Sequence, residues 1–202
     1  MEKPYASAPA RNAAPILGVL RHELRNCSTV FEIGSGTGQH AVTIAAALPG
    51  VTWQTSDLEQ SHEGIRAWIA DDGPGNVLPP MDFDVLSAAT PSSKYDAIFS
   101  ANTAHIMSYA AVCRMFELAG EMLNDPGLFC LYGPFSRGGR FSTRSNAAFD
   151  ASLRARNASM GIRDLDDLED LAHRNNMTLA RTYAMPANNL LTVWAATGAN
   201  CL

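Results

Sequence analysis

Apolar residues in this chain fall into two alternating kinds of run. In some runs they recur every three or four positions, as on one face of a helix; Ile16, Leu17, Leu20 and Leu24 are an example. Other runs are short, continuous apolar stretches bounded by turn-forming residues, which is typical of buried strands. The pattern predicts helices at 11–26, 41–48, 61–70, 109–123, 145–156 and 164–175, and strands at 29–33, 51–55, 76–80, 95–102, 128–132, 178–183 and 190–196.

Strands that alternate with helices indicate an α/β fold, in which helices cover both faces of a mostly parallel sheet. The chain has 202 residues, of which 47% are hydrophobic and 17% charged, a composition typical of a folded globular protein. We therefore expect residues 1–202 to form a single domain. Residues 1–10 are small and include prolines, so we expect a flexible arm or lid ahead of the helix at 11–26.

Three glycines separate the strand at 29–33 from the following helix. Gly34, Gly36 and Gly38 alternate with Ser35 and Thr37. Glycine has no Cβ atom and readily adopts positive φ, so a ligand can lie directly against the backbone of such a turn. The helix that follows offers unpaired backbone N–H groups at its start. The sequence therefore predicts a loop that holds a nucleotide-like molecule.

Two kinds of cofactor compete for this loop. A dinucleotide-binding turn needs G-x-G-x-x-G, but the third glycine here comes one position early. Asp57 lies 19 positions after Gly38 (57 − 38), where either cofactor needs an acid for its ribose hydroxyls. Glu32 favours S-adenosylmethionine, because a carboxylate there pairs with an amino-acid ammonium and repels a pyrophosphate. A nicotinamide-dependent oxidoreductase and a non-catalytic cofactor-binding or interaction module are the alternatives.

The pattern E-x-G-x-G-x-G after an apolar strand resembles motif I of the class I S-adenosylmethionine-dependent methyltransferases. This resemblance implies a Rossmann-like three-layer sandwich with a seven-stranded, mostly parallel sheet whose last strand is antiparallel. It also implies that Asp57 holds the ribose and that Asp84, with Asp82 as its rival, meets the adenine amino group. The implied cofactor-binding residues are Glu32, Gly34, Ser35, Gly36, Gly38, Asp57, Leu58, Asp84, Val85 and Asn102.

Short strings along nearly the whole chain resemble one small group within this superfamily, which includes methyltransferase-like protein twenty-six. Members of that group carry the methyltransferase fold but have no assigned substrate as a group. Thr103 and Ala104 stand where related sequences often carry a bulkier residue, and this departure would widen the pocket. The strings lie at 8–12, 34–40, 100–106, 132–135, 145–150, 161–164 and 185–190.

Methyl transfer from a sulfonium is an in-line displacement, so the enzyme mainly has to align the acceptor and exclude water. A general base helps only if the acceptor must lose a proton. His105 is the candidate, because it follows the carboxyl end of the strand at 95–102, where open α/β sheets bind their ligands. A histidine with a pKa near its ordinary value of roughly 6.5 accepts a proton at neutral pH. The alternative is a histidine that caps the next helix or bonds the backbone.

Three further residues are candidates for contact with the acceptor. Arg11 adjoins the N-terminal arm, and its guanidinium suits the carboxylate of the cofactor or of an acidic substrate. Tyr132 ends the strand at 128–132, so its hydroxyl can line the pocket, and Asn146 follows a glycine-containing loop. The alternatives are a solvated helix start for Arg11 and an amphipathic ring at the sheet edge for Tyr132.

Charge and composition limit the partners. The formal net charge is −5 and the arginines are scattered, which argues against bulk nucleic acid and anionic membranes as partners. The four cysteines form no CxxC pair and no His/Asp/Glu set has ligand spacing, so we expect neither a metal nor a disulfide. An apolar signal core and a membrane-length run are both lacking, so we expect a cytoplasmic protein. We expect a monomer or homodimer that methylates oxygen, nitrogen or sulfur of a small molecule, since about 200 residues leave little room for a recognition domain.

Overall fold

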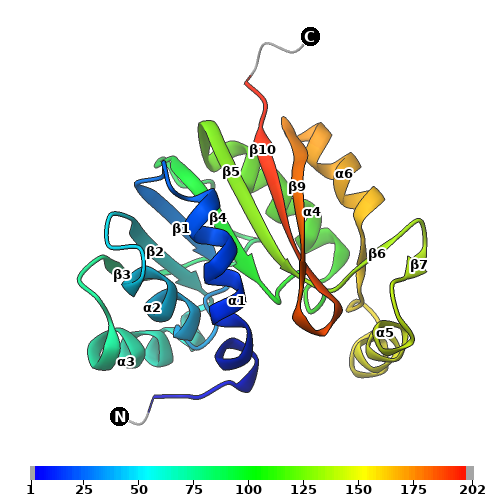
Figure 1. Cartoon of the computed structure of the whole chain (residues 1–202), viewed down its shortest axis with the longest axis horizontal. Helices are drawn as coiled ribbons and strands as arrows, with labels where there is room; N and C mark the ends of the chain where they lie inside the picture. Colours follow the sequence, from blue (N-terminus) through cyan, green and yellow to red (C-terminus); the bar gives the residue numbers. More distant parts are fainter. Residues whose placement is uncertain (1–2, 199–202) are drawn as a thin grey trace.

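The computed structural model describes residues 3–198 and shows helices alternating with strands along the chain (Figure 1). The helices are α1 (Ser7–Glu23), α2 (Gln39–Ala46), α3 (His62–Asp72), α4 (Tyr109–Met122), α5 (Arg144–Arg156) and α6 (Leu165–Arg174), with short 3-10 turns η1 (Glu59–Ser61) and η2 (Pro186–Asn188). The strands are β1 (Thr29–Ile33), β2 (Thr52–Asp57), β3 (Val77–Asp82), β4 (Tyr95–Ala101), β5 (Leu123–Gly133), β6 (Phe135–Arg137), β7 (Arg140–Phe141), β8 (Arg163–Asp164), β9 (Met177–Met185) and β10 (Asn189–Ala196).

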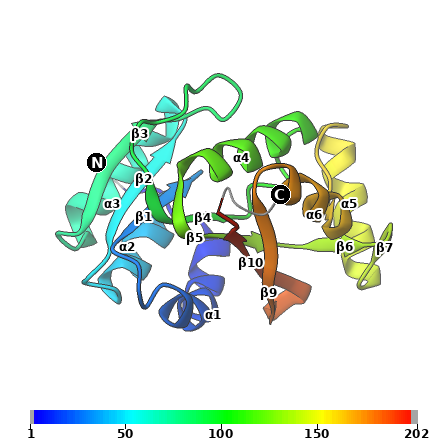
Figure 2. The same ribbon diagram turned by 90° about the horizontal axis from the view of Figure 1, so that it is seen from above.

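Seven strands form one sheet in the order β3-β2-β1-β4-β5-β10-β9. The pairs from β3 to β5 are parallel, whereas β10 is antiparallel to both β5 and β9. Figure 2 shows the sheet between α4 and α6 on one side and α1 and α2 on the other. The predicted three-layer α/β fold, with seven strands and an antiparallel last strand, is confirmed.

Two apolar clusters hold the helices against the sheet. On one face, Ile16 and Leu20 of α1 pack with Trp53 and Phe99 from the sheet. On the other face, residues of α4 and α6 pack against β5 and β10, with Trp194 fully buried among them. Because both faces are covered, the central strands read as continuous apolar runs in the sequence.

The first helix differs from its prediction. It begins at Ser7 rather than 11 and ends at Glu23 rather than 26, so only the described residues 3–6 remain as an arm. Pro9 lies in the first turn of the helix, where a missing N–H removes no helical hydrogen bond. The proline therefore does not mark the start of the helix. The arm is held down, because Trp68 Nε1 donates to Pro4 O at 2.6 Å and Lys3 pairs with Asp71 at 2.5 Å.

Two further segments differ from the predictions. The strand predicted at 128–132 begins earlier, at Leu123, and its added residues include a stretch where the pairing with β4 shifts register. A second, three-stranded sheet of order β7-β6-β8 follows β5 and was not predicted. Its strands have only two or three residues each, too few for an alternating pattern to be recognised.

Candidate cofactor and acceptor site

The glycine turn connects β1 to α2 and lies against β2. Backbone N–H groups of Gly34 and Ser35 donate to Ser56 O at 3.1 and 2.9 Å. Gly34 has φ +73°, and a Cβ atom there would lie 2.7 Å from Cγ2 of Thr103. Gly38 has φ +90°, and a Cβ atom there would lie 3.1 Å from Cα of Ile65 in α3. Larger residues would therefore displace the turn from its neighbours.

Asp57 fixes the middle of this turn from the end of β2. Its Oδ2 accepts a hydrogen bond from Gly36 N at 2.7 Å, and its Oδ1 accepts one from Leu58 N at 2.8 Å. Each carboxylate oxygen has a second lone pair, so both can still accept a hydroxyl proton from a ligand. The acid predicted to hold a ribose therefore also shapes the loop beside it.

A cavity of about 490 Å³ opens at the carboxyl ends of β1, β2 and β4, within the size range of small-molecule sites. The structure brings most of the predicted cofactor residues together on its wall: Gly34, Gly36, Asp57, Leu58, Asp84, Val85 and Asn102. Ser35 is buried beneath the turn and Gly38 is buried against α3. Sequence reasoning missed other lining residues, including Phe83, Leu86, Ile106 and Met107.

The structure also distinguishes the two rival acids near the carboxyl end of β3. Asp84 lines the cavity, and its Oδ1 accepts a hydrogen bond from Leu86 N at 3.0 Å. Asp82 is exposed at the end of β3, where it pairs in register with Asp57, and it is not among the lining residues. Asp84 is therefore the acid placed to meet a ligand.

Glu32 is 1% exposed and lies behind the cavity wall. Its Oε2 accepts hydrogen bonds from Ser35 Oγ at 2.8 Å and from Trp53 Nε1 at 3.0 Å. Burial raises the pKa of Glu32 to about 7, although both hydrogen bonds favour the charged form. Its Oε1 accepts no hydrogen bond from residues 3–198. Every fully enclosed side-chain N or O atom in those residues has a hydrogen-bond partner, so Oε1 is not fully enclosed. Oε1 is therefore open to another donor, and the ammonium role of Glu32 stays a prediction.

The loop after β4 forms the next part of the wall. Asn102 has φ +61°, and its N–H donates to Tyr132 O at 2.9 Å. Thr103 shares a 2.6 Å hydrogen bond with Ser100 through their hydroxyls, and its methyl group lies over Gly34. The glycine turn and this loop are therefore packed as one surface.

His105 follows in the same loop and is buried. Its ring lies 5.4 Å, centroid to centroid, from that of Phe149 of α5, and its Nδ1 lies 3.6 Å from the position of a Cβ on Gly133. Burial lowers the pKa of His105 to about 4, and the positive charges of Arg163 and Arg156 add to the effect. The expectation of an unperturbed pKa near 6.5 is therefore wrong, and His105 is neutral above about pH 5.

Arg163 holds the same loop in place and was not singled out as a functional residue by sequence reasoning. It is buried, and its guanidinium donates to the carbonyl oxygens of Ala104 at 2.9 Å, of Ser159 at 3.0 Å and of Met107. Only the string at 161–164 pointed to this segment. No local pattern indicates that an arginine will bond carbonyls 59 positions away in the sequence.

The three predicted acceptor residues lie in different surroundings. Tyr132 Oη accepts from Asn189 Nδ2 at 3.0 Å, and Asn146 Nδ2 donates to Asn188 O at 3.3 Å. Tyr132 therefore contacts the first residue of β10, and Asn146 contacts the connection between β9 and β10. Arg11 is exposed on α1, and no contact of its side chain joins it to the other two. Contact of all three with an acceptor stays a prediction.

The N-terminal part of α1 is nevertheless tied to the glycine turn. Asn12 Oδ1 bonds Nε2 of His40 at 2.7 Å, and both side chains are buried. Burial lowers the pKa of His40 to about 4, so its ring is neutral. Gln39, at the start of α2, accepts hydrogen bonds through Oε1 from Ala6 N at 2.6 Å and from Thr37 Oγ1 at 3.0 Å.

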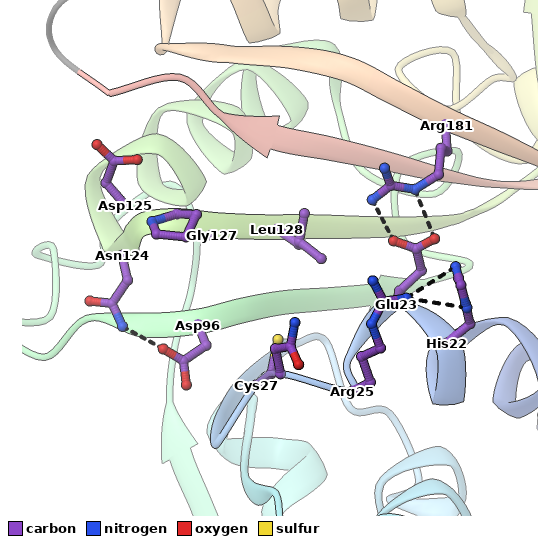
Figure 3. Close-up of a pocket in the computed structure, with 12 residues that line it drawn as sticks. His22, Glu23, Arg25, Cys27, Asp96, Asn124, Asp125, Gly127, Leu128 and Arg181 are labelled. Carbon is purple, nitrogen blue, oxygen red and sulfur yellow. Dashed lines mark hydrogen bonds and ion pairs between the residues drawn. The ribbon is translucent and has the colours of Figure 1, made fainter.

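A larger cavity, of about 660 Å³, lies at the opposite end of the sheet, where β4 and β5 begin (Figure 3). Glu23 forms a two-pronged pair there with Arg181, at 2.8 and 2.6 Å. Asp96 accepts hydrogen bonds from Asn124 Nδ2 and from the backbone N–H of Ser28, each at 2.8 Å. The residues that line this larger cavity include no predicted site residue. Open α/β sheets bind ligands at the carboxyl ends of their strands, so we assign this cavity a structural role.

Residues 3–198 contain no group of three or more His, Cys, Asp or Glu side chains placed to hold a metal ion. Within the same residues, no helix combines the length and apolar character needed to cross a bilayer. Cys27, Cys113 and Cys130 are free thiols, and Cys201 lies outside the described residues.

Comparison with solved structures finds methyltransferases. The chain superposes on an O-methyltransferase family protein from Burkholderia thailandensis with a TM-score of 0.80 and 14% identity, covering 92% of this chain and 56% of that one. The superposition on mitomycin 7-O-methyltransferase MmcR has a TM-score of 0.81 and 13% identity, and it covers 95% of this chain and 55% of that one. The superposition on human N-acetylserotonin methyltransferase in complex with SAM has a TM-score of 0.77 and 11% identity, and it covers 92% of this chain and 51% of that one. This chain therefore has a class I methyltransferase fold and spans little more than half the length of these proteins.

A family model described as "Protein of unknown function (DUF938)" matches residues 3–196. The chain belongs to this family.

Proposed function

We propose that this DUF938 protein is an S-adenosylmethionine-dependent methyltransferase that acts on an oxygen, nitrogen or sulfur atom of a small molecule. The observation that carries the proposal is the cavity at the carboxyl ends of β1, β2 and β4, which collects the glycine turn, Asp57 and Asp84 on one wall. Structural neighbours described as O-methyltransferases support it. The strings described above support kinship with the group of methyltransferase-like protein twenty-six.

The acidic residues in and behind the cavity wall each suit one part of S-adenosylmethionine. Oδ2 of Asp57 accepts from the glycine turn and Oδ1 accepts from Leu58 N, and both oxygens can also accept the ribose hydroxyl protons. Asp84, beside the apolar side chains of Leu58 and Val85, can accept from the adenine amino group while those side chains flank the ring. The open Oε1 of Glu32 can accept from the ammonium. When bound, the cofactor supplies a methyl group on a positively charged sulfur.

This chain's own contribution is to orient the acceptor and to exclude water. Asn102 and Thr103 form one wall, and Arg163 fixes the loop that continues to His105. His105 is neutral at pH 7 and can take a proton, but a pKa of about 4 makes it a weak base. It therefore suits an acceptor that loses its proton late or has none to lose.

The weakness of His105 as a base favours one second candidate, a non-catalytic S-adenosylmethionine-binding module. Such a module would bind cofactor tightly and transfer no methyl group. Incubation with methyl-labelled S-adenosylmethionine and a fractionated small-molecule extract separates the two. Labelled product in any fraction supports the enzyme, and tight binding with no labelled product supports the module.

Calorimetry with S-adenosylhomocysteine tests the cofactor assignment. We expect the wild type to bind S-adenosylhomocysteine but not NAD, because the cavity wall offers carboxylates rather than a pyrophosphate site. Asp84→Asn should weaken binding about tenfold, since the amide loses one acceptor oxygen. Asp82→Asn is the matched control, because it removes the neighbouring acid that lies off the cavity wall. Tight NAD binding without S-adenosylhomocysteine binding would overturn the proposal.

A further inference from the structure

The hairpin of β6 and β7 is held rigidly against the start of α6. Its two central residues, Gly138 and Gly139, have φ +59° and +71°, as a tight two-residue hairpin turn requires. Asp164 accepts hydrogen bonds from Gly139 N at 2.8 Å, from Gly138 N at 3.2 Å and from Ser136 Oγ at 2.9 Å. The hairpin is therefore a fixed feature of the surface rather than a loose loop.

This rigid hairpin carries a concentration of positive charge on an acidic protein. Residues 126–149 include Arg137, Arg140 and Arg144 but no Asp, Glu or Lys, although the chain has 20 acidic and 15 basic residues. Arg137 and Arg140 are directly opposite each other in the hairpin, so both point to one face. Like charges at such positions are destabilising, and Arg144, the first residue of α5, opposes the helix dipole.

Only one member of the pair is neutralised within the described chain. Arg137 bonds Asp166 at 3.1 Å and Glu169 at 2.7 Å, both from α6. The side chain of Arg140 is exposed and forms no ion pair or hydrogen bond with any other residue between 3 and 198. The N–H donors of its guanidinium are therefore free. Within the described residues, no ion pair of its own offsets the repulsion between Arg140 and Arg137.

Both arginines line a cavity of about 420 Å³. The rest of the lining combines hydroxyl groups with apolar side chains: Ser136, Ser142, Thr182, Phe135, Leu165 and Leu190. Apolar walls with a few converging polar groups are typical of small-molecule sites. A free guanidinium among hydroxyl groups selects a carboxylate or a phosphate.

The cavity adjoins the surroundings of His105. The rings of Phe135 and His105 both lie against Gly133, at 3.9 and 3.6 Å from the position of a Cβ there. On the other side, Ser142 Oγ accepts a hydrogen bond from Asn146 Nδ2 at 3.0 Å. Phe135 therefore lines the cavity and lies beside the same glycine as the candidate base.

We propose that this cavity binds the carboxylate or phosphate group of the small molecule that the protein methylates, with Arg140 as the anchoring cation. The assignment rests on the proposed function, because it takes the bound molecule to be the methyl acceptor. The anionic group is held at the hairpin, and the rest of the molecule extends past Phe135 towards His105. An acceptor of this class is a small organic acid or phosphate ester.

Calorimetric titration with four simple probes tests the site. Benzoate and phenyl phosphate carry the two anionic groups, and benzamide and benzyl alcohol are their neutral counterparts. We expect the wild type to bind at least one anionic probe and neither neutral probe, and Arg140→Gln to weaken that binding about tenfold or more. Arg21→Gln, which removes an exposed arginine from α1, is the control and should bind as the wild type does.

The comparison of anionic probes shows which group the cavity prefers. Equal binding of charged and neutral probes, or equal anion binding by wild type and Arg140→Gln, would overturn the proposal. Tight Arg140-dependent binding of an acidic peptide, with none of the small anions, would also overturn it. The thermal midpoint of each variant shows whether it is folded, and an exposed arginine can be replaced with little effect on it.

The same titrations with S-adenosylhomocysteine keep this inference separate from the proposed function. Arg140→Gln should bind S-adenosylhomocysteine as tightly as the wild type, because Arg140 does not line the cofactor cavity. Loss of anion binding with normal S-adenosylhomocysteine binding removes the acceptor site alone. Absence of S-adenosylhomocysteine binding by the wild type removes the proposed function, and with it the identification of the bound anion as an acceptor.

Discussion

Replacing Glu32 by glutamine should stabilise the protein and weaken its hold on the cofactor. Burial raises the pKa of Glu32 from its ordinary 4.5 to about 7, so the folded protein keeps a proton that the unfolded chain releases between those values. The contribution of Glu32 to stability is therefore lost as the pH rises from 4.5 to 7. A pKa difference of about 2.5 (7 − 4.5) corresponds to roughly 3 kcal/mol at pH 8. Glutamine has a similar shape and no charge, so it avoids this loss.

Urea denaturation at pH 5, 6, 7 and 8 measures the effect. The free energy of unfolding of Glu32→Gln should rise relative to that of the wild type by roughly 2–3 kcal/mol between pH 5 and pH 8. Asp82→Asn is the control, since its carboxylate is exposed and its removal should leave no such trend. A difference that does not change with pH would refute the protonated, buried state of Glu32.

Cofactor binding gives the second half of the same test. An ammonium beside Oε1 favours the charged carboxylate, so binding at pH 6.5 should release a proton from Glu32. Calorimetry in phosphate and in Tris buffer measures that proton through the difference in observed heats. Glu32→Gln should release none and should bind S-adenosylhomocysteine at least tenfold more weakly. Equal affinity and no proton release in the wild type would remove Glu32 as the ammonium partner.

Three further substitutions test contacts that hold the glycine turn, the loop after β4 and the opposite end of the sheet. Gly34→Ala should lower the free energy of unfolding by about 2–4 kcal/mol, because of its φ of +73° and the 2.7 Å contact with Thr103 Cγ2; adding Thr103→Ser should restore part of this in chemical denaturation. Arg163→Lys should cost about 2–4 kcal/mol, since one ammonium cannot reach three carbonyls, and faster amide hydrogen exchange at 104–107 would show the loosened loop. Glu23→Gln should cost about 1–2 kcal/mol, because Arg181 is half-exposed; an unchanged thermal midpoint would show that the pair contributes nothing.

The cofactor end of the site was predictable because its residues sit at sequence positions fixed by the fold. Gly34 directly follows β1 and Asp57 is the last residue of β2, and parallel strands end at one edge of the sheet. The apolar run of β1 therefore locates Gly34, and the spacing of 19 positions from Gly38 locates Asp57 (57 − 38). The choice between Asp82 and Asp84 needed the structure, because one acid ends β3 and the other follows it by two positions.

The acceptor end was less predictable, because it depends on contacts between distant segments. Arg163 and the carbonyls that it bonds come from different parts of the chain, and the partners of Arg137 lie in α6. The low pKa of His105 follows from burial among such segments. Residues 136–145 appeared only as a glycine-containing loop, since strands of two or three residues show no alternation.

The antiparallel strand β10 lies between β5 and β9, although it is the last of the seven in chain order. During synthesis, β5 must therefore wait with an open edge until residues 189–196 emerge, because no earlier strand supplies its second partner. Such an edge attracts other chains. The final insertion also brings the Asn189 amide to the hydroxyl of Tyr132. The nascent polypeptide thus acquires β1 and the glycine turn early, and its sheet is complete only after β10 has been inserted.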